Sequence, residues 1–381
     1  MKYRLSDICF YVKEKVAVSV LENTDYVSTE NMIPNKGGIT TATSLPSSFK
    51  TQAYQKHDVL VSNIRPYFKK IWFSDCNGGC SNDVLVFRAK DGTDARFLYY
   101  VLADDAFFDY STATSKGTKM PRGDKTAIMQ YEVPYFDLKT QKKIARILTD
   151  IDYKITLNNN INKNLLEQAL TMYAMQFATL DRNGCIGDYC SVKSGFAFKS
   201  SWWTTAGVKV IKIGSINQDN LNLLECSYVD ADKIDKAKDF KVNAGDLLIA
   251  MTGATIGKFA MVPYSSELLL VNQRVGKFFL GNKPVEKLPF IYCTLKQPEV
   301  YGEVVNRGQG SAQPNISASD IMSIPCVIPS QDAINDFNGT AQPLFDLIIS
   351  NQRENQQLSE VRDTLLPKLM FGELDVSDIE I

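Results

Sequence analysis

Histidine is almost absent from this chain of 381 residues, and so are the motifs of common catalytic sites. The single histidine, His57, precedes a predicted strand, a position typical of a surface turn. A His-based triad or zinc site would depend entirely on this one residue. No G-x-x-x-x-G-K-[ST] phosphate loop occurs, because TGATIGK at 252–258 is one residue too short and Phe259 follows its lysine. The [ND]-P-P-[YF] motif of methyltransferases that act on base amines is missing too. We assign no catalytic residue.

Long apolar runs and closely paired cysteines are also missing. No segment approaches the roughly 20 consecutive apolar residues of a membrane span, and the N-terminus lacks a signal-peptide core. We therefore expect a cytoplasmic protein without a membrane segment. The eight cysteines include no C-x-x-C motif, and the pairs Cys76/Cys80 and Cys185/Cys190 are too loosely spaced for a zinc site. We expect reduced thiols and no bound metal.

The composition, with 44% hydrophobic and 22% charged residues, is typical of a globular protein long enough for two or three cores. The formal net charge is −1, but residues 330–381 alone hold 10 acidic and 3 basic residues. A nucleic-acid-binding protein needs to be basic only on the face that meets phosphate. The near-neutral total therefore neither excludes nor indicates such a partner.

The chain contains an internal repeat, which decides its predicted architecture. Four stretches of the first half match four stretches of the second half in the same order, with a spacing that drifts as loop insertions would make it. The matched stretches are RLSDICFYVK at 4–13 with CIGDYCSVK at 185–193, HDVLVSN at 57–63 with GDLLIAM at 245–251, GTKMPR at 117–122 with GSAQPN at 310–315, and EVPYFDLKTQKKI at 132–144 with SIPCVIPSQDAI at 323–334.

Each copy ends in a segment with a heptad pattern. One series of alternating steps of four and three runs from Ile144 to Gln176, and adding 193 to each number gives a second series from Phe337 to Leu369. Such steps mark the a and d positions of paired helices, whereas a single helix on a globular core would show a wider stripe of period 3.6. We assign to the seam between the helices Ile151, Ile155, Asn158, Asn162, Leu165, Leu344, Ile348, Asn351, Asn355, Leu358 and Leu365.

Prolines predict where these helices begin and end. Pro343 matches Asp150 in the repeat, and proline suits the first turn of a helix. We expect long helices of roughly 28 residues, about 42 Å at ~1.5 Å per residue. They would begin near these two residues, after short helices at 141–148 and 331–341. The second helix is expected to end near Pro367 and Gly372.

The segments before the helices have a different pattern. Short β-rich runs such as DVLVSNI and VKVIKIGSI are separated by Gly, Pro, Asn and Asp turn signals, and a helical element follows in each segment. We predict two repeated α+β domains, 1–139 and 181–329, each followed by a helical region, 140–180 and 330–381.

This order of parts resembles the specificity subunit of Type I restriction-modification systems, over essentially the whole chain. The resemblance is most specific around the helices, in the P-x-x-x-K-T-Q-K-K-I pattern that leads into the first helix and in LSEVRDTLLPKLMFGEL at the end of the second. The residues that carry it are Pro134, Gln141, Ile144, Leu148 and Asp152 for the first helix, and Leu358, Arg362, Leu365, Leu366, Pro367, Lys368, Leu369, Gly372 and Glu373 for the second.

The resemblance implies a non-catalytic reader of double-stranded DNA. Its two target-recognition domains would each bind one half of a bipartite site, and the two long helices would pack as an antiparallel coiled coil about a pseudo-twofold axis. Two methyltransferase (modification) subunits would dock on it, with restriction subunits in the full complex. S-adenosylmethionine and ATP would bind to those partners, so no cofactor is expected on this chain.

Candidate DNA-binding residues lie mostly on loops at matching places in the two repeats. Arg suits guanine and Asn or Gln suits adenine, whereas Lys more often neutralises phosphate. Solvated loops, and core packing for one tryptophan, are the alternatives. The candidates are Arg65, Lys69, Lys70, Lys116, Lys119, Arg122 and Lys125 in the first repeat, and Lys199, Trp202, Trp203, Thr252, Thr255, Lys258, Arg307, Gln309, Gln313 and Asn315 in the second.

Four seam asparagines occupy the middle of the predicted helix pair. In an antiparallel arrangement Asn158 is expected near Asn355, and Asn162 near Asn351. Buried seam asparagines give up stability and fix the register of a helix pair. Asn159 lies off the seam and is expected to face solvent or a partner.

Two other classes of function remain open at this point. A scaffold whose coiled coil recruits proteins, and whose β-rich domains bind peptide or carbohydrate, would suit the acidic tail and the near-neutral charge. An autonomous DNA-modifying enzyme is disfavoured by the missing motifs. Binding to random duplex DNA, with and without a methyltransferase, distinguishes a DNA-reading subunit from a scaffold. Binding of S-adenosylmethionine to the isolated chain would favour the autonomous enzyme.

Overall fold

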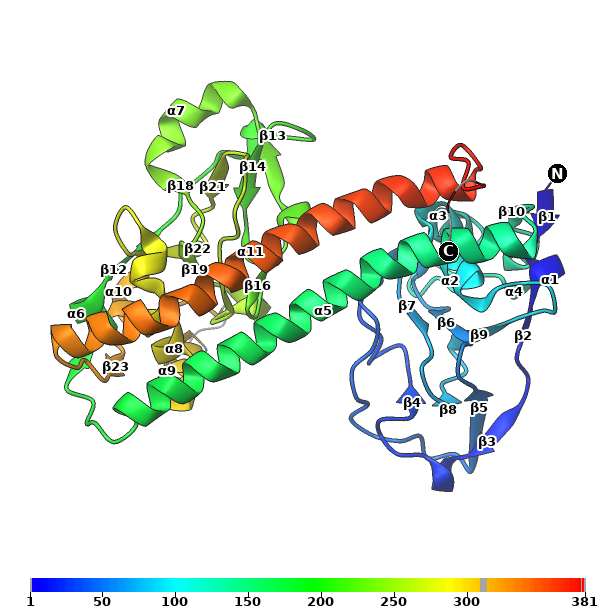
Figure 1. Ribbon diagram of the computed structural model, residues 1–381, viewed down its shortest axis with the longest axis horizontal. Helices are drawn as coiled ribbons and strands as arrows, with labels where there is room; N and C mark the ends of the chain where they lie inside the picture. Colours follow the sequence, from blue (N-terminus) through cyan, green and yellow to red (C-terminus); the bar gives the residue numbers. More distant parts are fainter. Residues whose placement is uncertain (1, 309–313, 378, 380–381) are drawn as a thin grey trace. The chain divides into compact units, whose positions relative to one another are not determined.

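The computed structural model describes residues 2–308, 314–377 and 379 of the chain (Figure 1). Its contacts divide the chain into a first unit, Met1–Tyr153 with Ser359–Ile381, and a second unit, Lys154–Leu358. Each unit combines an α+β segment with parts of the two long helices, α5 (Leu138–Phe177) and α11 (Gln331–Met370). Among the described residues, no helix is both long and apolar enough to cross a membrane.

The first unit contains two four-stranded sheets and the helices α2 (Ala95–Ala103) and α3 (Asp105–Ala113). The carboxylates of Asp94 and Asp104 cap these helices by accepting hydrogen bonds from their first-turn N–H groups. The antiparallel sheet has the order β2 (Cys9–Tyr11), β9 (Val84–Ala89), β6 (Val59–Ser62) and β7 (Ile71–Phe73), and the mixed sheet has the order β3 (Lys15–Ala17), β5 (Lys50–Tyr54), β8 (Gly78–Cys80) and β4 (Tyr26–Val27).

The second unit contains a four-stranded and a five-stranded sheet, with helices α8 (Leu288–Leu295) and α9 (Pro298–Gly308). The four-stranded sheet has the order β12 (Ser191–Ser194), β22 (Val275–Phe279), β19 (Leu247–Ala250) and β20 (Phe259–Met261), and the five-stranded sheet has the order β13 (Trp203–Thr204), β17 (Ser227–Val229), β14 (Val208–Ile211), β21 (Leu269–Val271) and β18 (Lys241–Val242).

The repeat predicted from the sequence is present in the topology. In the antiparallel sheet of the first unit and in the four-stranded sheet of the second unit, the first strand in the chain pairs with the last, which pairs with the second, which pairs with the third. The α+β segment of each unit also opens with a short strand and a one-turn helix, in which the carboxylate of Asp7 or Asp188 accepts a 2.8 Å hydrogen bond from the backbone three residues earlier. These opening strands are β1 (Lys2–Arg4), paired with β10 (Glu132–Pro134), and β11 (Gly184–Cys185), paired with β23 (Pro325–Cys326). The predicted α+β class with two repeated domains is confirmed.

The strands β6 and β19 are buried along their whole length because each separates two apolar clusters. Val59 and Val61 face one cluster of the first unit, while Leu60 faces another. In the second unit Leu247 and Ile249 face one cluster, while Leu248 faces another. A strand covered on both faces reads as an unbroken apolar run, which is the form of VLVS and LLIA in the sequence.

An ion pair with a buried carboxylate lies at the start of each of these strands, and it was not among the features predicted from the sequence. Asp58 accepts two 2.8 Å hydrogen bonds from the guanidinium of Arg88. At the matching place the carboxylate of Asp246 forms an ion pair of 2.6 Å with the ammonium of Lys277. Burial raises the pKa of Asp246, and Lys277 opposes that rise.

Both long helices are uninterrupted over 40 residues, so the predicted starts near Asp150 and Pro343 are wrong. The expected length of roughly 28 residues is also wrong, because 40 residues span about 60 Å. Pro343 removes one helical hydrogen bond, but its neighbours Ala341 and Phe345 are fully buried and hold the helix in place. The prediction for the other end holds: α11 ends at Met370, and Gly372 follows with a left-handed φ of +70°.

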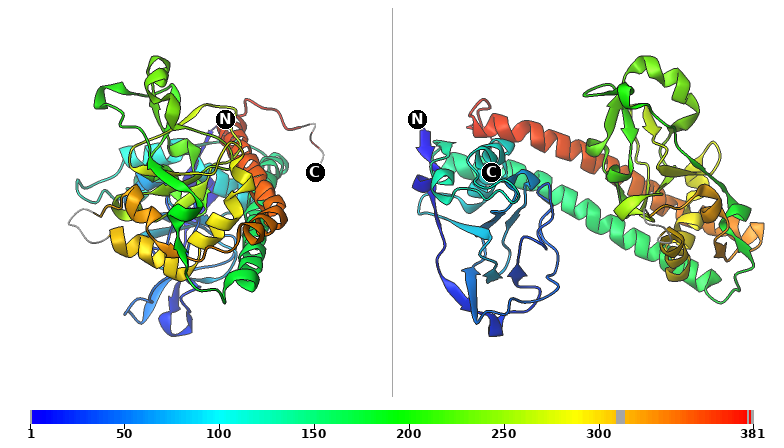
Figure 2. Two further views of the ribbon diagram at one scale, coloured as in Figure 1. Left: turned by 90° about the vertical axis from the view of Figure 1, so that its left-hand side faces the viewer. Right: turned by 180° about the vertical axis from the view of Figure 1, so that it is seen from behind.

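In each unit a stretch of α5 lies beside a stretch of α11 that runs in the opposite direction (Figures 1 and 2). In the first unit Ile144 and Leu148 share a core cluster with Leu366 and Leu369. In the second unit the rings of Tyr173 and Phe177 both lie 5.6 Å from the ring of Phe337. Gln176 is exposed although the heptad places it on the seam. Of the predicted seam, three residues are buried and the rest are half-buried, the buried ones being Asn158, Ile348 and Asn351.

The segment after α11 returns to the beginning of α5 within the first unit. The ammonium of Lys143 is buried there and donates hydrogen bonds to the carbonyls of Val376, at 3.1 Å, and Ser377. Val376 is itself part of the first unit's core. A buried ammonium needs such acceptors, because an unpaired buried charge is strongly destabilising.

Candidate nucleic-acid interface

In the first unit two of the predicted DNA-binding loops are joined by backbone hydrogen bonds. One follows β6 and carries Arg65, and the other precedes the short helix α4 (Lys125–Ile128). The N–H of Arg65 donates to the carbonyl of Pro121 at 2.8 Å, and the N–H of Gly123 donates to the carbonyl of Asn63 at 3.1 Å. Lys116 and Arg122 exchange two 2.9 Å hydrogen bonds that close the second loop into a hairpin.

The corresponding loops of the second unit meet in the same way. The N–H of Gly253, in the loop after β19, donates to the carbonyl of Pro314 at 3.1 Å. Thr252 and Asn315 form an isolated antiparallel bridge, and the N–H of Ile316 donates to the carbonyl of Met251 at 3.0 Å. The sequence placed these loop pairs at matching positions, and the structure brings each pair together.

The loop after β6 holds two non-glycine residues in the left-handed backbone region, Arg65 (φ 49°) and Lys69 (φ 50°). Each costs on the order of 1 kcal/mol, and such strain clusters at functional sites. Lys69 is anchored at 2.9 Å to Asp105, which also pairs with Lys36 at 2.8 Å. Burial alone would raise the pKa of Asp105, but hydrogen bonds from the two lysines hold it below its ordinary value.

Buried polar atoms without a partner mark both loops. The Oδ1 of Asn63 and the Nε of Arg65 make no hydrogen bond in the first unit, nor do the Oγ1 atoms of Thr252 and Thr255 in the second. An unpaired buried polar group costs about 1–3 kcal/mol, so each such atom calls for an explanation, of which a binding role is one. Asn63 was not predicted, although its place at the end of an apolar strand, matching Met251, was visible in the repeat.

Other predicted residues already have partners in their own unit. Arg122 contacts Asp83 at 3.1 Å, and Lys116 pairs with Asp124 at 2.5 Å. The ammonium of Lys70 donates to the carbonyl of Thr29, and burial lowers its pKa.

Arg307 was expected on a loop but lies in the last turn of α9. It donates to Glu303 at 3.1 Å, to the Asp320 carbonyl at 2.9 Å and to the Ser323 hydroxyl at 2.7 Å. These contacts hold α9 against the short helix α10 (Ala318–Met322). The expectation of a loop residue is therefore wrong.

The two tryptophans differ in their surroundings. Trp202 is buried in a small core with Phe198, so it cannot stack on DNA without leaving that core. Trp203 is half-buried, and the ammonium of Lys212 lies 3.5 Å from its ring centroid. Lys199, 5.9 Å from the Trp202 ring, is exposed. Of the remaining candidates, Lys119, Lys125 and Asn315 are exposed, Lys258 is half-buried, and Gln309 and Gln313 lie outside the described residues.

The seam asparagines of the second unit meet as predicted. The Nδ2 of Asn158 donates to Asn355 Oδ1 at 2.9 Å, and the Nδ2 of Asn351 donates to Asn162 Oδ1 at 2.8 Å. Asn159 is exposed, as expected for a residue off the seam, and it also accepts a 2.8 Å hydrogen bond from Asn355.

Glu354 joins the same cluster. It accepts a 2.7 Å hydrogen bond from Asn158 and pairs with Lys154 at 3.2 Å. The repeat gives no sign of Glu354 at this place, because the matching residue is Ile161.

No disulfide joins the cysteines, and six of the eight are buried. All eight cysteines are free, and burial raises the pKa of Cys9 and Cys80 to about 12, so both remain protonated at neutral pH. His57 lies in an exposed turn with φ 75° and stacks on Phe73. Within residues 2–308, 314–377 and 379, no three His, Cys, Asp or Glu side chains gather as metal ligands.

Comparison with known proteins identifies the family. The model of a family described as the Type I restriction modification DNA specificity domain matches residues 1–167 and 182–360, which include both repeats. The Type I restriction enzyme MjaIX specificity subunit of Methanocaldococcus jannaschii is 25% identical over 318 residues, which cover 76% of this chain and 71% of that protein. The HindI specificity subunit of Haemophilus influenzae is 22% identical over 459 residues, covering 98% and 99%.

A solved structure shares the fold. The crystal structure of a Type I restriction-modification system S subunit from M. genitalium covers 99% of this chain and 96% of its own, with a TM-score of 0.52 and 17% sequence identity. This likeness extends over both repeats and both long helices. The chain therefore belongs to the family of Type I restriction-modification specificity subunits, the components that recognise the DNA target in these systems.

Proposed function

We propose that this chain reads a bipartite site in double-stranded DNA, with one half-site bound by each unit. The main support is the repeated pair of loops: the loop after β6 or β19 is joined to the loop before α4 or α10, and each pair carries unpartnered polar atoms. Arg65 and Asn63 are suited to guanine and adenine edges, and Thr252 and Thr255 to either. Because the two sets of residues differ, the two half-sites are expected to differ in sequence.

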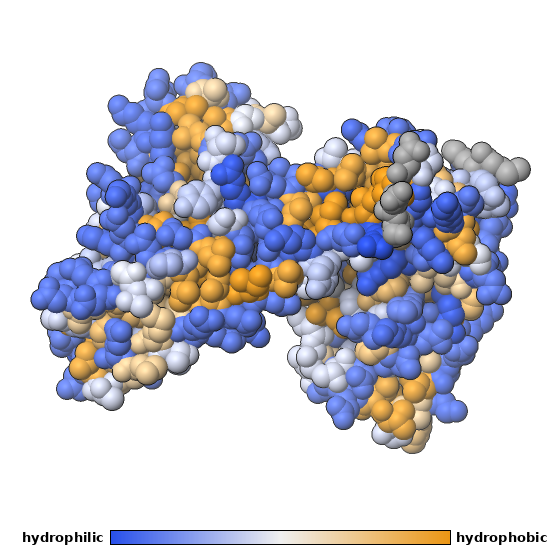
Figure 3. Space-filling view, in the orientation of Figure 1, coloured by the Kyte–Doolittle hydropathy of each residue, from blue (hydrophilic) through white to orange (hydrophobic). Residues whose placement is uncertain are grey.

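The chain acts, in this proposal, without chemistry of its own and as the assembly platform of a larger complex in the cytoplasm. Two methyltransferase subunits dock on it, and restriction subunits complete the complex. S-adenosylmethionine and ATP bind to those partners. Exposed apolar surface supports a docking role. Figure 3 shows hydrophobic patches on the face that it draws, and the exposed large side chains of the helices include Tyr153 and Leu157 of α5 and Leu347 and Val361 of α11.

The experiment measures binding of fluorescent duplexes by the chain co-purified with its methyltransferase partner. Arg65→Ala should weaken binding to one half-site by about 1–3 kcal/mol, and the double variant Thr252→Val/Thr255→Val should weaken binding to the other half-site only. Lys56→Ala, at an exposed turn of the first unit, serves as the control. If neither variant discriminates between half-sites, these loops are not the readers.

Two outcomes would overturn the proposal as a whole. If no duplex binds, with or without the methyltransferase, the chain is a scaffold. Binding of S-adenosylmethionine to the isolated chain would instead indicate an enzyme.

A further inference from the structure

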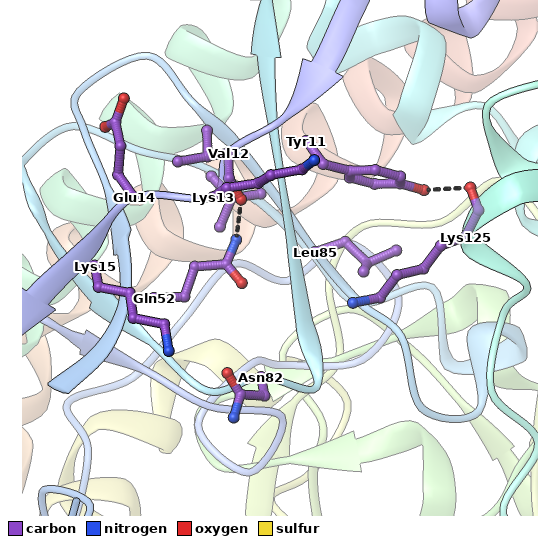
Figure 4. Close-up of a pocket in the computed structure, with 10 residues that line it drawn as sticks. Tyr11, Val12, Lys13, Glu14, Lys15, Gln52, Asn82, Leu85 and Lys125 are labelled. Atoms are coloured by element: carbon purple, nitrogen blue, oxygen red, sulfur yellow. Dashed lines mark hydrogen bonds between the residues drawn. The ribbon is translucent and has the colours of Figure 1, made fainter.

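A cavity of about 290 Å³ opens in the first unit, beside the proposed DNA-reading loops (Figure 4). Tyr11 on β2, Lys15 on β3 and Gln52 on β5 form part of its wall. Lys125, the first residue of α4, closes it on the side of the loop that carries Arg122. The cavity thus adjoins a surface that the proposed function already places against DNA.

Three lysines line this cavity, and their charges are unmatched. Lys13, Lys15 and Lys125 are exposed, and in the described part of the chain no carboxylate forms an ion pair with any of them. Glu14 is the acidic lining residue, but its carboxylate turns away from the ammonium groups of Lys15 and Lys125 in Figure 4. Glu14 pairs instead with Arg88 at 3.4 Å.

The acidic residues beside the lining are also neutralised by other partners. Asp83, next to the lining residue Asn82, is paired with Arg122 at 3.1 Å. Asp124, next to Lys125, is paired with Lys116 at 2.5 Å, and this hydrogen bond holds the pKa of the Asp124 carboxyl below its ordinary value. The cavity is therefore left with an excess of positive charge.

Hydrogen bonds fix the walls around this charge. The Nε2 of Gln52 donates to the carbonyl of Val12 at 2.8 Å, and the hydroxyl of Tyr11 donates to the carbonyl of Lys125 at 3.1 Å. The ammonium of Lys15, the amide of Asn82 and the ammonium of Lys125 border one common space in Figure 4. A space bordered by fixed backbone and several mobile cationic donors suits a phosphate group.

The second unit does not repeat this set of cations. Asp7 and Asp188 occupy the same place in the capped helices that open the two units, so the numbering offset there is 188 − 7 = 181. Lys13 and Lys15 then match Ser194 and Phe196. Lys125 follows the cap of α4 as Ala318 follows the cap of α10.

We propose that this cavity binds a backbone phosphate of the DNA and that the described part of the second unit has no such grip at the matching place. The proposal rests on the proposed function, because the phosphate belongs to the duplex that the adjoining loops read. A phosphate contact positions the protein without reading sequence. The first unit would therefore hold the duplex more firmly, and more salt-sensitively, than the second.

The test uses the chain in complex with its methyltransferase and measures duplex affinity over a range of salt concentrations. Lys15→Ala with Lys125→Ala should weaken binding about 10-fold or more at low salt, by the same factor for every target sequence. The slope of log K against log salt should fall by about 1, since one phosphate contact is lost. Lys125→Arg should keep the wild-type slope, and Lys56→Ala is the matched control.

Three outcomes would overturn the inference. An unchanged slope in the double variant, with wild-type binding intact, would refute the phosphate grip and leave the proposed function standing. Loss confined to one target sequence would mean that these lysines read bases. Thermal stabilisation by inorganic phosphate that the double variant loses, without any change in DNA affinity, would assign the cavity to free phosphate. If the wild-type complex binds no duplex at all, the proposed function itself fails.

Discussion

The helix pair is held together by different chemistry in the two units. In the first unit Asp152 of α5 pairs with Arg362 of α11 at 2.9 Å and accepts a 2.7 Å hydrogen bond from the hydroxyl of Tyr100. The repeat places Phe345 at the position of Asp152 (345 − 152 = 193) and Ala169 at that of Arg362 (362 − 169 = 193). Both of these residues are fully buried in the second unit's apolar core.

The two kinds of contact are expected to play different roles, one in stability and the other in the choice of partner helix. Apolar burial stabilises whichever apolar partner fills the space, whereas the half-buried pair of Asp152 and Arg362 requires an opposite charge on the partner helix. Burial opposes ionisation of Arg362, but the carboxylates of Asp152 and Asp363 raise its pKa above the ordinary value, so it remains charged. The aromatic end should therefore contribute most of the stability, and the ionic end should select the correct partner helix.

Phe345→Ala should have the largest effect. Truncating a fully buried phenylalanine costs about 3–5 kcal/mol, because a cavity remains where the ring contacted its neighbours. Denaturant unfolding followed by circular dichroism, with limited proteolysis to locate the weakened unit, measures the loss. If Phe345→Ala costs less than Arg362→Ala, the apolar end is not the stronger one.

Asp152→Asn should cost less, about 1–3 kcal/mol, because the half-buried guanidinium of Arg362 loses one carboxylate but keeps that of Asp363 at 2.8 Å. Replacing both partners, Asp152→Leu with Arg362→Leu, should recover most of that loss, since well-packed apolar residues can replace an ion pair. The same unfolding experiment applies. A double variant as unstable as the single one would mean that the ion pair contributes to stability and does not only select the partner helix.

Replacing Asn158, Asn162, Asn351 and Asn355 by leucine should raise the melting temperature of the second unit. Each kcal/mol gained corresponds to roughly 2–4 °C for a unit of this size. The variant should also tolerate a wider range of half-site spacings, because the asparagine contacts fix the register. Calorimetry and binding to duplexes of varied spacing test the two parts, and an unaltered spacing preference would contradict the second.

Glu354→Gln should have the smallest effect, a loss of stability that is present at neutral pH and disappears in acid. Hydrogen bonding by Asn158, followed by the influence of Lys154, holds the pKa of Glu354 below its ordinary value of 4.5. Its contribution to stability is therefore present above pH 4.5 and is lost as the pH falls through the lowered value. Unfolding free energies between about pH 3 and pH 6 should fall less steeply in the variant than in wild type.

The sequence predicted those features that repeat at a fixed spacing. The contacts of Asn158 with Asn355 and of Asn162 with Asn351 followed from a constant offset of 193 and an antiparallel pair. The continuity of α11 did not follow, because the propensity of Pro343 was overridden by burial on either side of it, which a local pattern does not contain.

Contacts specific to one unit were equally invisible in the sequence. Asp219 has a left-handed backbone (φ 65°) in the turn between β15 (Ile216–Asn217) and β16 (Asn220–Leu221). It binds Tyr292 and Lys296 at 2.5 Å through its carboxylate and accepts a 3.0 Å hydrogen bond from Gln352 through its carbonyl. The cluster joins residues that are more than 130 positions apart in the sequence. The matched stretches of the repeat do not include it, so their spacing could not predict it.

The contacts of Lys143 make the segment beyond α11 part of the first unit's fold. Proteolytic trimming usually removes chain ends at little thermodynamic cost. Clipping here after Phe371 would spare every residue of both long helices, yet it would remove Val376 from a core and take two carbonyl acceptors from a buried ammonium. A truncation chosen from the helix boundary alone would therefore damage the domain at the opposite end of the sequence.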